Sequence, residues 1–204
     1  MQIIRIETRF KVFLFIRGYM KNKLFIDLLP LETERLFIRP TGEEDIELIL
    51  KMDKQETTQE FLGGIKNKTK EERIEFLKRK KKKFEDGLAG SLTICLKDGT
   101  PIGFTGLNID ENNNEAEISY IFDVDYTKRG YCFEACKKLI DTAFNSLHLH
   151  RVYADTIDGN NGSKKVLEKL GFAFEGTRRE AAYIKEKDEY RDFLDYGLLK
   201  DEYK

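Results

Sequence analysis

One dipeptide, Asp98-Gly99, constrains this chain more than any other feature, because it favours the tight turn that joins two antiparallel strands. Ser91 to Leu96 precedes it and Ile102 to Ile109 follows it, and both segments are rich in residues that favour strands. A polar turn at Asp110 to Asn114 then leads to Ala116 to Phe122, a further segment of the same kind. The middle of the chain is therefore predicted to be a meander of antiparallel strands.

Helical patterns lie on both sides of this meander. Thr41 with Glu44 and Thr69 with Glu72 have the spacing of a capping box, which predicts that a helix begins at each threonine. Beyond residue 126, apolar residues recur with the period of an α-helix. They are Cys136, Leu139, Ile140, Ala143, Phe144 and Leu147. The remaining elements are predicted strands at Leu36 to Arg39, Val152 to Ile157 and Phe193 to Leu199, and a short helix at Ser163 to Leu170.

The charge of the chain narrows the class of partner. The 36 Lys and Arg residues oppose 37 Asp and Glu residues, so a net charge of −1 does not draw the whole chain to nucleic acid or to a membrane. A basic run, Arg79 to Lys83, is interpreted as the solvated face of a helix, with a nucleic-acid patch as the alternative. No direct nucleic-acid partner is therefore expected.

The length of 204 residues suits one ordinary domain, and the first thirty residues are set apart from it. We expect residues 1–30 to be an N-terminal extension of uncertain order and residues 31–204 to be the domain. The apolar run Phe10 to Ile16 is too short to span a bilayer, and basic residues follow it closely, so neither a membrane anchor nor a secretory signal is predicted. Met20 is a plausible alternative start.

The number and spacing of the cysteines and histidines indicate a reducing compartment and do not predict a metal site. Cys95, Cys132 and Cys136 cannot form a closed disulfide framework, and no pair has the spacing of a structural zinc site. His148 and His150 lie beside a predicted strand and not four residues apart on a helix. We therefore predict a cytoplasmic protein without a metal.

The loop Thr127 to Cys132 is the strongest candidate for a binding site. A glycine-containing turn that enters a helix presents unpaired backbone N–H groups, and the helix dipole adds partial positive charge. Gly130 would let the backbone approach a diphosphate closely, and Lys128 and Arg129 add cationic side chains. The loop alone is weak support, because basic residues and a glycine precede many helices.

The same loop resembles the Q/R-x-x-G-x-G/A acyl-CoA loop of the GNAT superfamily, with Thr127 and Cys132 departing from the pattern. Other segments resemble the RimJ/RimL branch of that family, in the expected order and over about residues 31–204. They are Glu34-Arg35-Leu36 with Arg39-Pro40, Glu117-Ile118-Ser119-Tyr120, Arg151-Val152, Asn160 to Ser163, Leu167 to Phe172, Glu175-Gly176 and Asp192 to Tyr196.

The resemblance implies an α/β fold of the α+β type, in which a mixed, twisted sheet is flanked by helices and splayed between its fourth and fifth strands. Here those strands are Ala116 to Phe122 and Val152 to Ile157. The resemblance further implies that acetyl-CoA is the cosubstrate and that its pantetheine arm enters the splay. The implied cofactor-binding residues are Ile118, Tyr120, Lys128, Arg129, Gly130, Tyr131, Cys132, Phe133 and Asn160.

Acetyl transfer from a thioester to an amine needs a neutral amine and a stabilised leaving thiolate. Glu117 is the candidate base, with an ordinary strand carboxylate as the alternative. Many GNAT enzymes place a tyrosine near the sulfur, but the corresponding position here is Leu167. Ser163 is therefore the candidate donor to the thiolate, with a structural role as helix N-cap as the alternative.

Three kinds of function follow from the resemblance. The first is acetylation of a protein or peptide N-terminus of the ribosomal-protein type, by a monomer or homodimer. The second is acetylation of a small amine such as a polyamine or aminoglycoside, which an acidic acceptor cleft would favour. The third is a catalytically weakened regulatory domain that binds acetyl-CoA, because Ser119, Thr127 and Leu167 all depart from common patterns.

Overall fold

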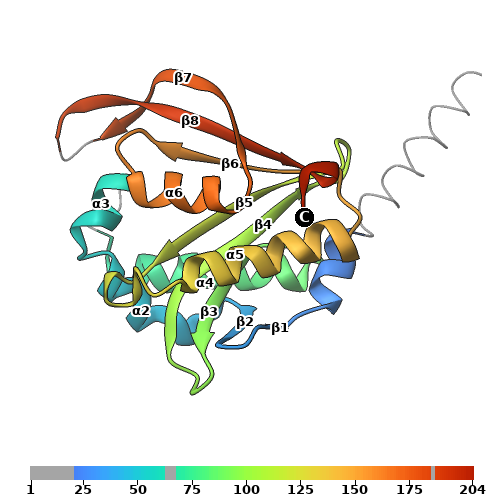
Figure 1. Cartoon of the computed structure of the whole chain (residues 1–204). Helices are drawn as coiled ribbons and strands as arrows, with labels where there is room; N and C mark the ends of the chain where they lie inside the picture. The colour runs from blue at the N-terminus through green and yellow to red at the C-terminus, as the bar shows by residue number, and fades with distance from the viewer. Residues whose placement is uncertain (1–20, 63–67, 185–186) are drawn as a thin grey trace, which may run out of the picture.

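The computed structural model describes residues 21–62, 68–184 and 187–204, and its centre is one mixed sheet (Figure 1). Within these residues the sheet has eight strands in the order β1-β2-β3-β4-β5-β6-β8-β7. The strands are β1 (Leu31–Glu32), β2 (Leu36–Pro40), β3 (Ser91–Leu96), β4 (Pro101–Asp110), β5 (Glu115–Phe122), β6 (Arg151–Ile157), β7 (Ala173–Ile184) and β8 (Glu189–Leu199). The predicted meander is β3, β4 and β5, paired antiparallel.

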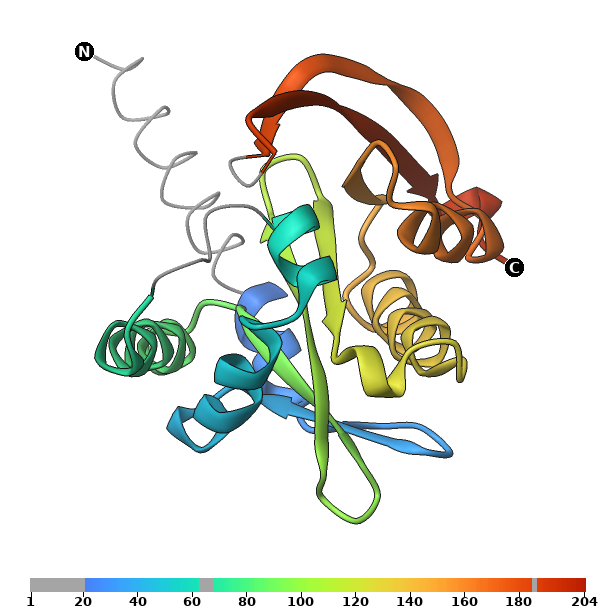
Figure 2. The same cartoon turned by 90° about the vertical axis from the view of Figure 1, so that its left-hand side faces the viewer.

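Helices cover both faces of the sheet, as Figure 2 shows with α4 and α5 on opposite sides. The helices are α2 (Ile46–Met52), α3 (Glu56–Leu62), α4 (Lys70–Glu85), α5 (Tyr131–Asp141) and α6 (Asn161–Lys169). A π-helical turn, Thr142–Ser146, extends α5, and the short 3-10 helices are η1 (Glu43–Asp45), η2 (Val124–Tyr126) and η4 (Lys200–Glu202). The six apolar residues predicted for one face of α5 and its extension are all buried in the main core, which confirms that helix.

The splay of the sheet lies between β5 and β6, as expected. These neighbours are parallel, and within the described residues their ladder joins only Glu115, Ala116 and Glu117 to Arg151, Val152 and Tyr153. From Ile118 and Ala154 onward the two strands separate. The fold class predicted from the sequence is therefore confirmed, and a gap opens halfway along β5.

The two predicted capping boxes have different outcomes. Thr69 caps α4, its hydroxyl accepting from Glu72 N–H at 3.1 Å while the Glu72 carboxylate accepts from Thr69 N–H, as predicted. The box predicted at Thr41 with Glu44 is wrong. One residue further on, the Asp45 carboxylate accepts from Gly42 N–H at 2.9 Å.

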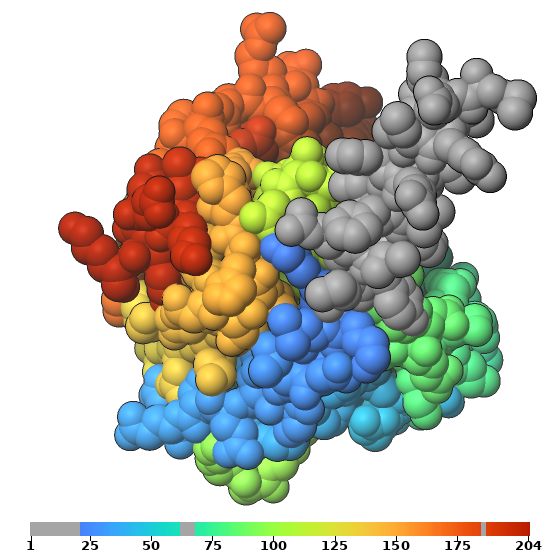
Figure 3. All heavy atoms as spheres, turned by 90° about the vertical axis from the view of Figure 1, so that its right-hand side faces the viewer, coloured from blue at the N-terminus to red at the C-terminus, as the bar shows by residue number. Residues whose placement is uncertain are grey.

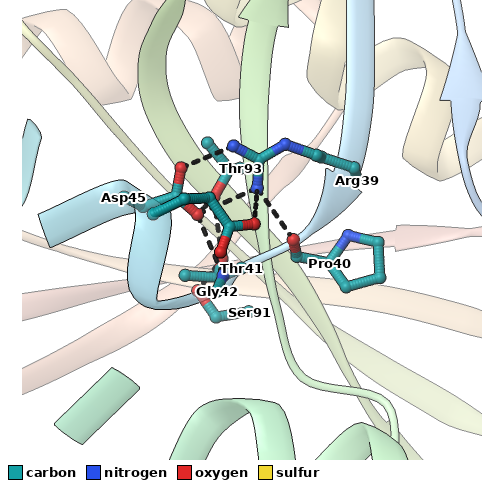
Figure 4. A network of polar contacts seen from close by, with 8 residues as sticks. Arg39, Pro40, Thr41, Gly42, Asp45, Ser91 and Thr93 are labelled. Atoms are coloured by element: carbon teal, nitrogen blue, oxygen red, sulfur yellow. Dashed lines mark hydrogen bonds and ion pairs between the residues drawn. The ribbon is translucent and has the colours of Figure 1, made fainter. Parts of the chain in front are cut away.

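Asp45 is placed there by a buried polar network, drawn in Figure 4. Its carboxylate is fully buried and accepts from both terminal nitrogens of Arg39, at 2.7 and 2.9 Å, and from the Thr93 hydroxyl at 2.7 Å. The Thr41 hydroxyl bonds with the hydroxyl groups of Thr93 and Ser91 and does not cap the helix. Because a buried carboxylate needs partners, these tertiary contacts outweigh the local capping pattern.

A helix of residues 21–27 packs against the rest of the chain, although the sequence suggests an extension up to residue 30. Phe25 is fully buried in the main core, and the Asn22 side chain donates to Glu111 and accepts from Ala89 N–H. Figure 3 shows this blue segment beside the far end of α5 in gold. The boundary at residue 30 stays a prediction, and the run Phe10 to Ile16 lies outside the described residues. Within the described residues, no helix has the length and apolar character to cross a membrane.

Candidate active site

The loop before α5 forms a cradle of backbone N–H groups. Gly130 is the N-cap with a φ of 83°, and no side chain caps the helix there. The first bond inside the helix runs from Glu134 N–H to the Gly130 carbonyl, so the N–H groups of residues 131–133 have no recorded acceptor in the described part of the chain. Lys128 is also left-handed, with a φ of 59°, and such alternation makes a concave anion-binding nest. The loop therefore fits the diphosphate of a nucleotide cofactor.

Arg35 on the loop before β2 holds this cradle in place. Its guanidinium donates to the Arg129 carbonyl at 3.1 Å and forms an ion pair with Glu134 at 2.5 Å. Burial works to raise the pKa of Glu134, but hydrogen bonds from Thr33 and Arg35 outweigh it and leave the pKa below its usual range. Arg35 also lies over the Tyr131 ring, 4.7 Å from its centroid. The first turn of α5 is thus fixed from outside without using the N–H groups of the cradle.

A second anchor lies at the start of the same loop. The carboxylate of Asp123, whose side chain is only 2% exposed, accepts from Lys51 and, at 2.7 Å, from Gln55. The Gln55 amide oxygen in turn accepts from Val124 N–H at 3.2 Å. These contacts tie α2 and the turn after it to the segment that leads into the cradle.

The gap between β5 and β6 contains two hydroxyl groups in contact. Tyr120 Oη on β5 lies 2.9 Å from Ser163 Oγ in the first turn of α6. Burial, together with nearby Cys136, raises the pKa of Tyr120 well above its usual range, although the bond with Ser163 acts in the opposite direction. Tyr120 therefore remains a neutral phenol.

The N-cap of α6 is Asn160 and not Ser163. The Asn160 side chain accepts from Ser163 N–H at 3.1 Å, and the helix begins at Asn161. The structural role suggested for Ser163 thus belongs to Asn160, which leaves the serine hydroxyl to Tyr120 and to whatever enters the gap.

On the opposite face of β5 an open pocket of about 420 Å³ lies over β6, β8 and β7. Its lining includes the carboxylates of Glu115, Glu117, Asp155, Glu175 and Asp195 and the guanidinium groups of Arg151 and Arg178. Five carboxylates against two guanidinium groups leave a formal charge of −3. The pocket is therefore suited to a cation.

The two arginines divide four of these carboxylates between them. Arg151 bridges Glu115 and Glu175, and Arg178 bridges Asp155 and Asp195. The carboxylate of Glu117, which is half-buried on β5, makes no hydrogen bond or ion pair within the described residues. It belongs to the last paired position before the strands separate, opposite Tyr153. Glu117 is thus the pocket carboxylate available to a ligand, at the mouth of the gap.

The family model described as an acetyltransferase (GNAT) domain matches residues 35–173. The chain belongs to the GNAT acetyltransferase family. GNAT acetyltransferases use acetyl-CoA, and the N–H cradle and the splayed sheet fit that cosubstrate.

Curated GNAT relatives match parts of the chain. A protein named putative ribosomal N-acetyltransferase YdaF, from Bacillus subtilis, is 38% identical over 109 residues, which cover 53% of this chain and 58% of that protein. An uncharacterized N-acetyltransferase, p20 from Bacillus licheniformis, is 38% identical over 58% of this chain and 66% of its own length. The chain therefore spans less than two thirds of the length of these two relatives.

A solved structure matches this chain over most of the fold. A crystal structure described as a probable acetyltransferase is 28% identical to this chain, with a TM-score of 0.76, and the match covers 84% of this chain and 96% of that one. RimL, described as a ribosomal L7/L12 acetyltransferase in complex with coenzyme A, has a TM-score of 0.74 at 20% identity over 83% and 97% of the chains, and shows the fold alone.

Against this GNAT frame, the residues predicted from the sequence fall into two groups. Residues 128–133 form the cradle, and Ile118, Tyr120, Asn160 and Ser163 lie at the gap. Glu117 lies on the other face of β5 from Ile118, as strand alternation predicts. The binding and catalytic roles of these residues stay predictions.

Sequence reasoning missed the partners that surround them. The strand predicted at Val152 to Ile157 is present, but the prediction did not include that one face of β6 carries Arg151, Tyr153 and Asp155 into the pocket. The alternation of polar and apolar residues in this strand was the available signal. The anchoring pairs of Arg35 and Asp123 join residues far apart in sequence and leave no such local pattern.

Proposed function

We propose that this chain is an N-acetyltransferase that transfers the acetyl group of acetyl-CoA to a primary amine. One observation supports it above the others: the gap between β5 and β6 links an N–H cradle suited to a diphosphate with an unpaired carboxylate suited to an amine. The cradle of residues 128–133 would hold the diphosphate, and the free edge of β5 from Ile118 onward would hold the pantetheine arm.

Glu117 would remove the proton that the amine loses as its nitrogen bonds to the acetyl carbon. Neither Arg151 nor Arg178 neutralises this carboxylate, so it remains free to accept a proton directly or through a water. Ser163 would donate a hydrogen bond to the sulfur, which takes the electron pair of the broken carbon–sulfur bond and then one proton from solvent. Atoms and charge balance without a covalent bond to the protein.

For the acceptor we propose a protein or peptide N-terminus. The Bacillus subtilis relative, named a putative ribosomal N-acetyltransferase, supports this choice, and the open form of the pocket admits an extended chain.

A small polycationic amine is the second candidate, because the pocket charge of −3 exceeds what a single ammonium group neutralises. A weakened regulatory domain has less support, since the cradle and Glu117 are both intact. We also propose that the protein acts in the cytoplasm.

The cofactor site is tested by Gly130→Glu, with isothermal titration of acetyl-CoA. Gly130 has a φ of 83°, which strains any other residue, and a glutamate adds negative charge beside the proposed diphosphate site, so the variant should lose detectable affinity. Gly99→Glu is the matched control, since Gly99 has a φ of 90° in a turn with nothing within 4 Å of an added Cβ. Unchanged affinity in a folded Gly130→Glu variant would place the cofactor elsewhere.

The acceptor is tested by following thiol release from acetyl-CoA with three panels: short peptides with free N-termini, polyamines and aminoglycosides. Turnover of peptides alone supports the first candidate, and turnover of polyamines alone supports the second. If acetyl-CoA binds but no amine in any panel is acetylated, the regulatory alternative is favoured.

A further inference from the structure

The contact between Tyr120 and Ser163 is a hydrogen bond between two hydroxyl groups, and its direction matters for the site. Either oxygen can donate across the 2.9 Å that separates them. Ser163 N–H already donates to Asn160, so the serine backbone is held in place while its hydroxyl can still rotate.

Burial favours Tyr120 as the donor. If Ser163 donated, the phenol hydrogen of Tyr120 would have to find another acceptor inside the core, and the next one recorded in the described part of the chain is the Ser163 carbonyl at 3.4 Å. A buried donor without a good partner is costly, and a phenol is more acidic than a serine hydroxyl and hence the better donor. With Tyr120 as donor, the hydrogen of Ser163 must point away from the ring.

We propose that Tyr120 is a positioning residue for Ser163: it donates to Ser163 Oγ and so directs the serine hydrogen into the gap between β5 and β6. This inference rests on the proposed function, in which the sulfur of acetyl-CoA lies in that gap. The proposal also accounts for Leu167 on α6, the position at which many GNAT enzymes have a tyrosine. In this chain the phenol would come from Tyr120 on β5 and would act through Ser163.

The first test needs no acceptor amine. Coenzyme A is bound to the protein, and the thiolate absorbance in the far ultraviolet is followed against pH. A hydrogen bond from Ser163 should lower the pKa of the bound thiol, and Tyr120→Phe should raise it again by about one unit. In a Ser163→Ala background the same Tyr120→Phe change should have no further effect, since there is no hydroxyl left to position.

Controls separate positioning from packing. Tyr183→Phe removes another tyrosine hydroxyl, one that bonds to Asp188 near the turn between β7 and β8, and should leave the thiol unchanged. Ser163→Thr keeps a hydroxyl and should retain the sensitivity to Tyr120→Phe, which also covers the case in which a Ser163→Ala protein folds poorly. With an acceptor from the screen, Tyr120→Phe should lower kcat about tenfold and change the KM for acetyl-CoA less than twofold.

Two results overturn the inference. One is a thiol pKa that Tyr120→Phe leaves unchanged, and the other is an equal shift in the Ser163→Ala background, which would show that Tyr120 acts without the serine. A wild-type protein that does not bind coenzyme A in calorimetry overturns the proposed function itself, before either variant is compared.

Discussion

Asp45 and Glu117 both carry a carboxylate, but the two side chains differ in burial and in the number of hydrogen-bond partners. Asp45 is fully buried and accepts from Arg39, Gly42 and Thr93. Glu117 is half-buried in an open pocket, and no partner is recorded for it among the described residues although two arginines lie in the same pocket. The Asp45 carboxylate is fully used in hydrogen bonds that stabilise the fold, whereas the Glu117 carboxylate remains available to a ligand.

The contrast shows that partners, and not residue type, decide which of these carboxylates is available to a ligand. The same contrast exists inside the pocket, because Arg151 and Arg178 each form ion pairs with two of the other four carboxylates, whereas Glu117 has none among the described residues. A substitution at Asp45 should therefore lower the free energy of unfolding, whereas a substitution at Glu117 should lower kcat.

The largest effect is expected for Asp45→Ala. Removing the buried carboxylate leaves Gly42 N–H and the Thr93 hydroxyl without this acceptor and Arg39 with only the exposed Glu44, which should cost about 3–5 kcal/mol in the free energy of unfolding, measured by urea titration. Glu44→Gln is the matched control, because Glu44 also pairs with Arg39 but its side chain is 63% exposed. That control should change stability by less than about 0.5 kcal/mol. Equal losses in both variants would contradict the structural role of the buried network.

Glu117→Gln should produce the reverse pattern. With an acceptor from the screen, kcat should fall about a hundredfold, since a positioned base contributes roughly that much or more. The unfolding midpoint should stay near that of the wild type, because no recorded partner is lost. Normal turnover would make Glu117 an ordinary strand carboxylate, whereas loss of both turnover and stability would show an unrecognised structural contact.

The smallest effect is expected at the start of α6. Asn160→Ala should cost about 1 kcal/mol of stability, the usual value of a lost N-cap. Ser163→Ala, made in a Tyr120→Phe background so that no buried phenol loses its acceptor, should leave the melting temperature nearly unchanged, because the serine does not cap the helix. Calorimetric unfolding of the two variants compares them directly, and the opposite order of melting temperatures would return the cap to Ser163.

Elements with local signals could be predicted from the sequence. The meander, the cap at Thr69, the apolar face of α5 and the turn at Gly130 each depend on residues a few positions apart, so spacing alone identifies them. The helix cap predicted at Thr41 was wrong because contacts with residues far away in the sequence decide the local structure there. Asp45 is drawn to Arg39 and Thr93, and contacts across strands override the local pattern.

The pocket could not be predicted, because its charge pairs depend on strand register. Arg178 meets Asp195 only through the pairing of β7 with β8, which shifts between Phe174 and Gly176 and again between Arg178 and Ala182. A shift of one residue sends a side chain to the other face of a sheet. Without that register, five carboxylates spread over eighty residues of sequence give no sign that they converge.

The position of β8 has a consequence for biosynthesis. Strand β8 follows β7 in the chain, yet it does not lie at the edge of the sheet but between β6 and β7. Until Glu189–Leu199 has emerged, β6 has an open edge toward solvent, β7 has no neighbour, and the wall of the pocket that Asp195 provides does not exist. A nascent chain can therefore assemble the cradle on α5 before β8 has emerged, but it can complete the pocket only once Glu189–Leu199 is available to pair.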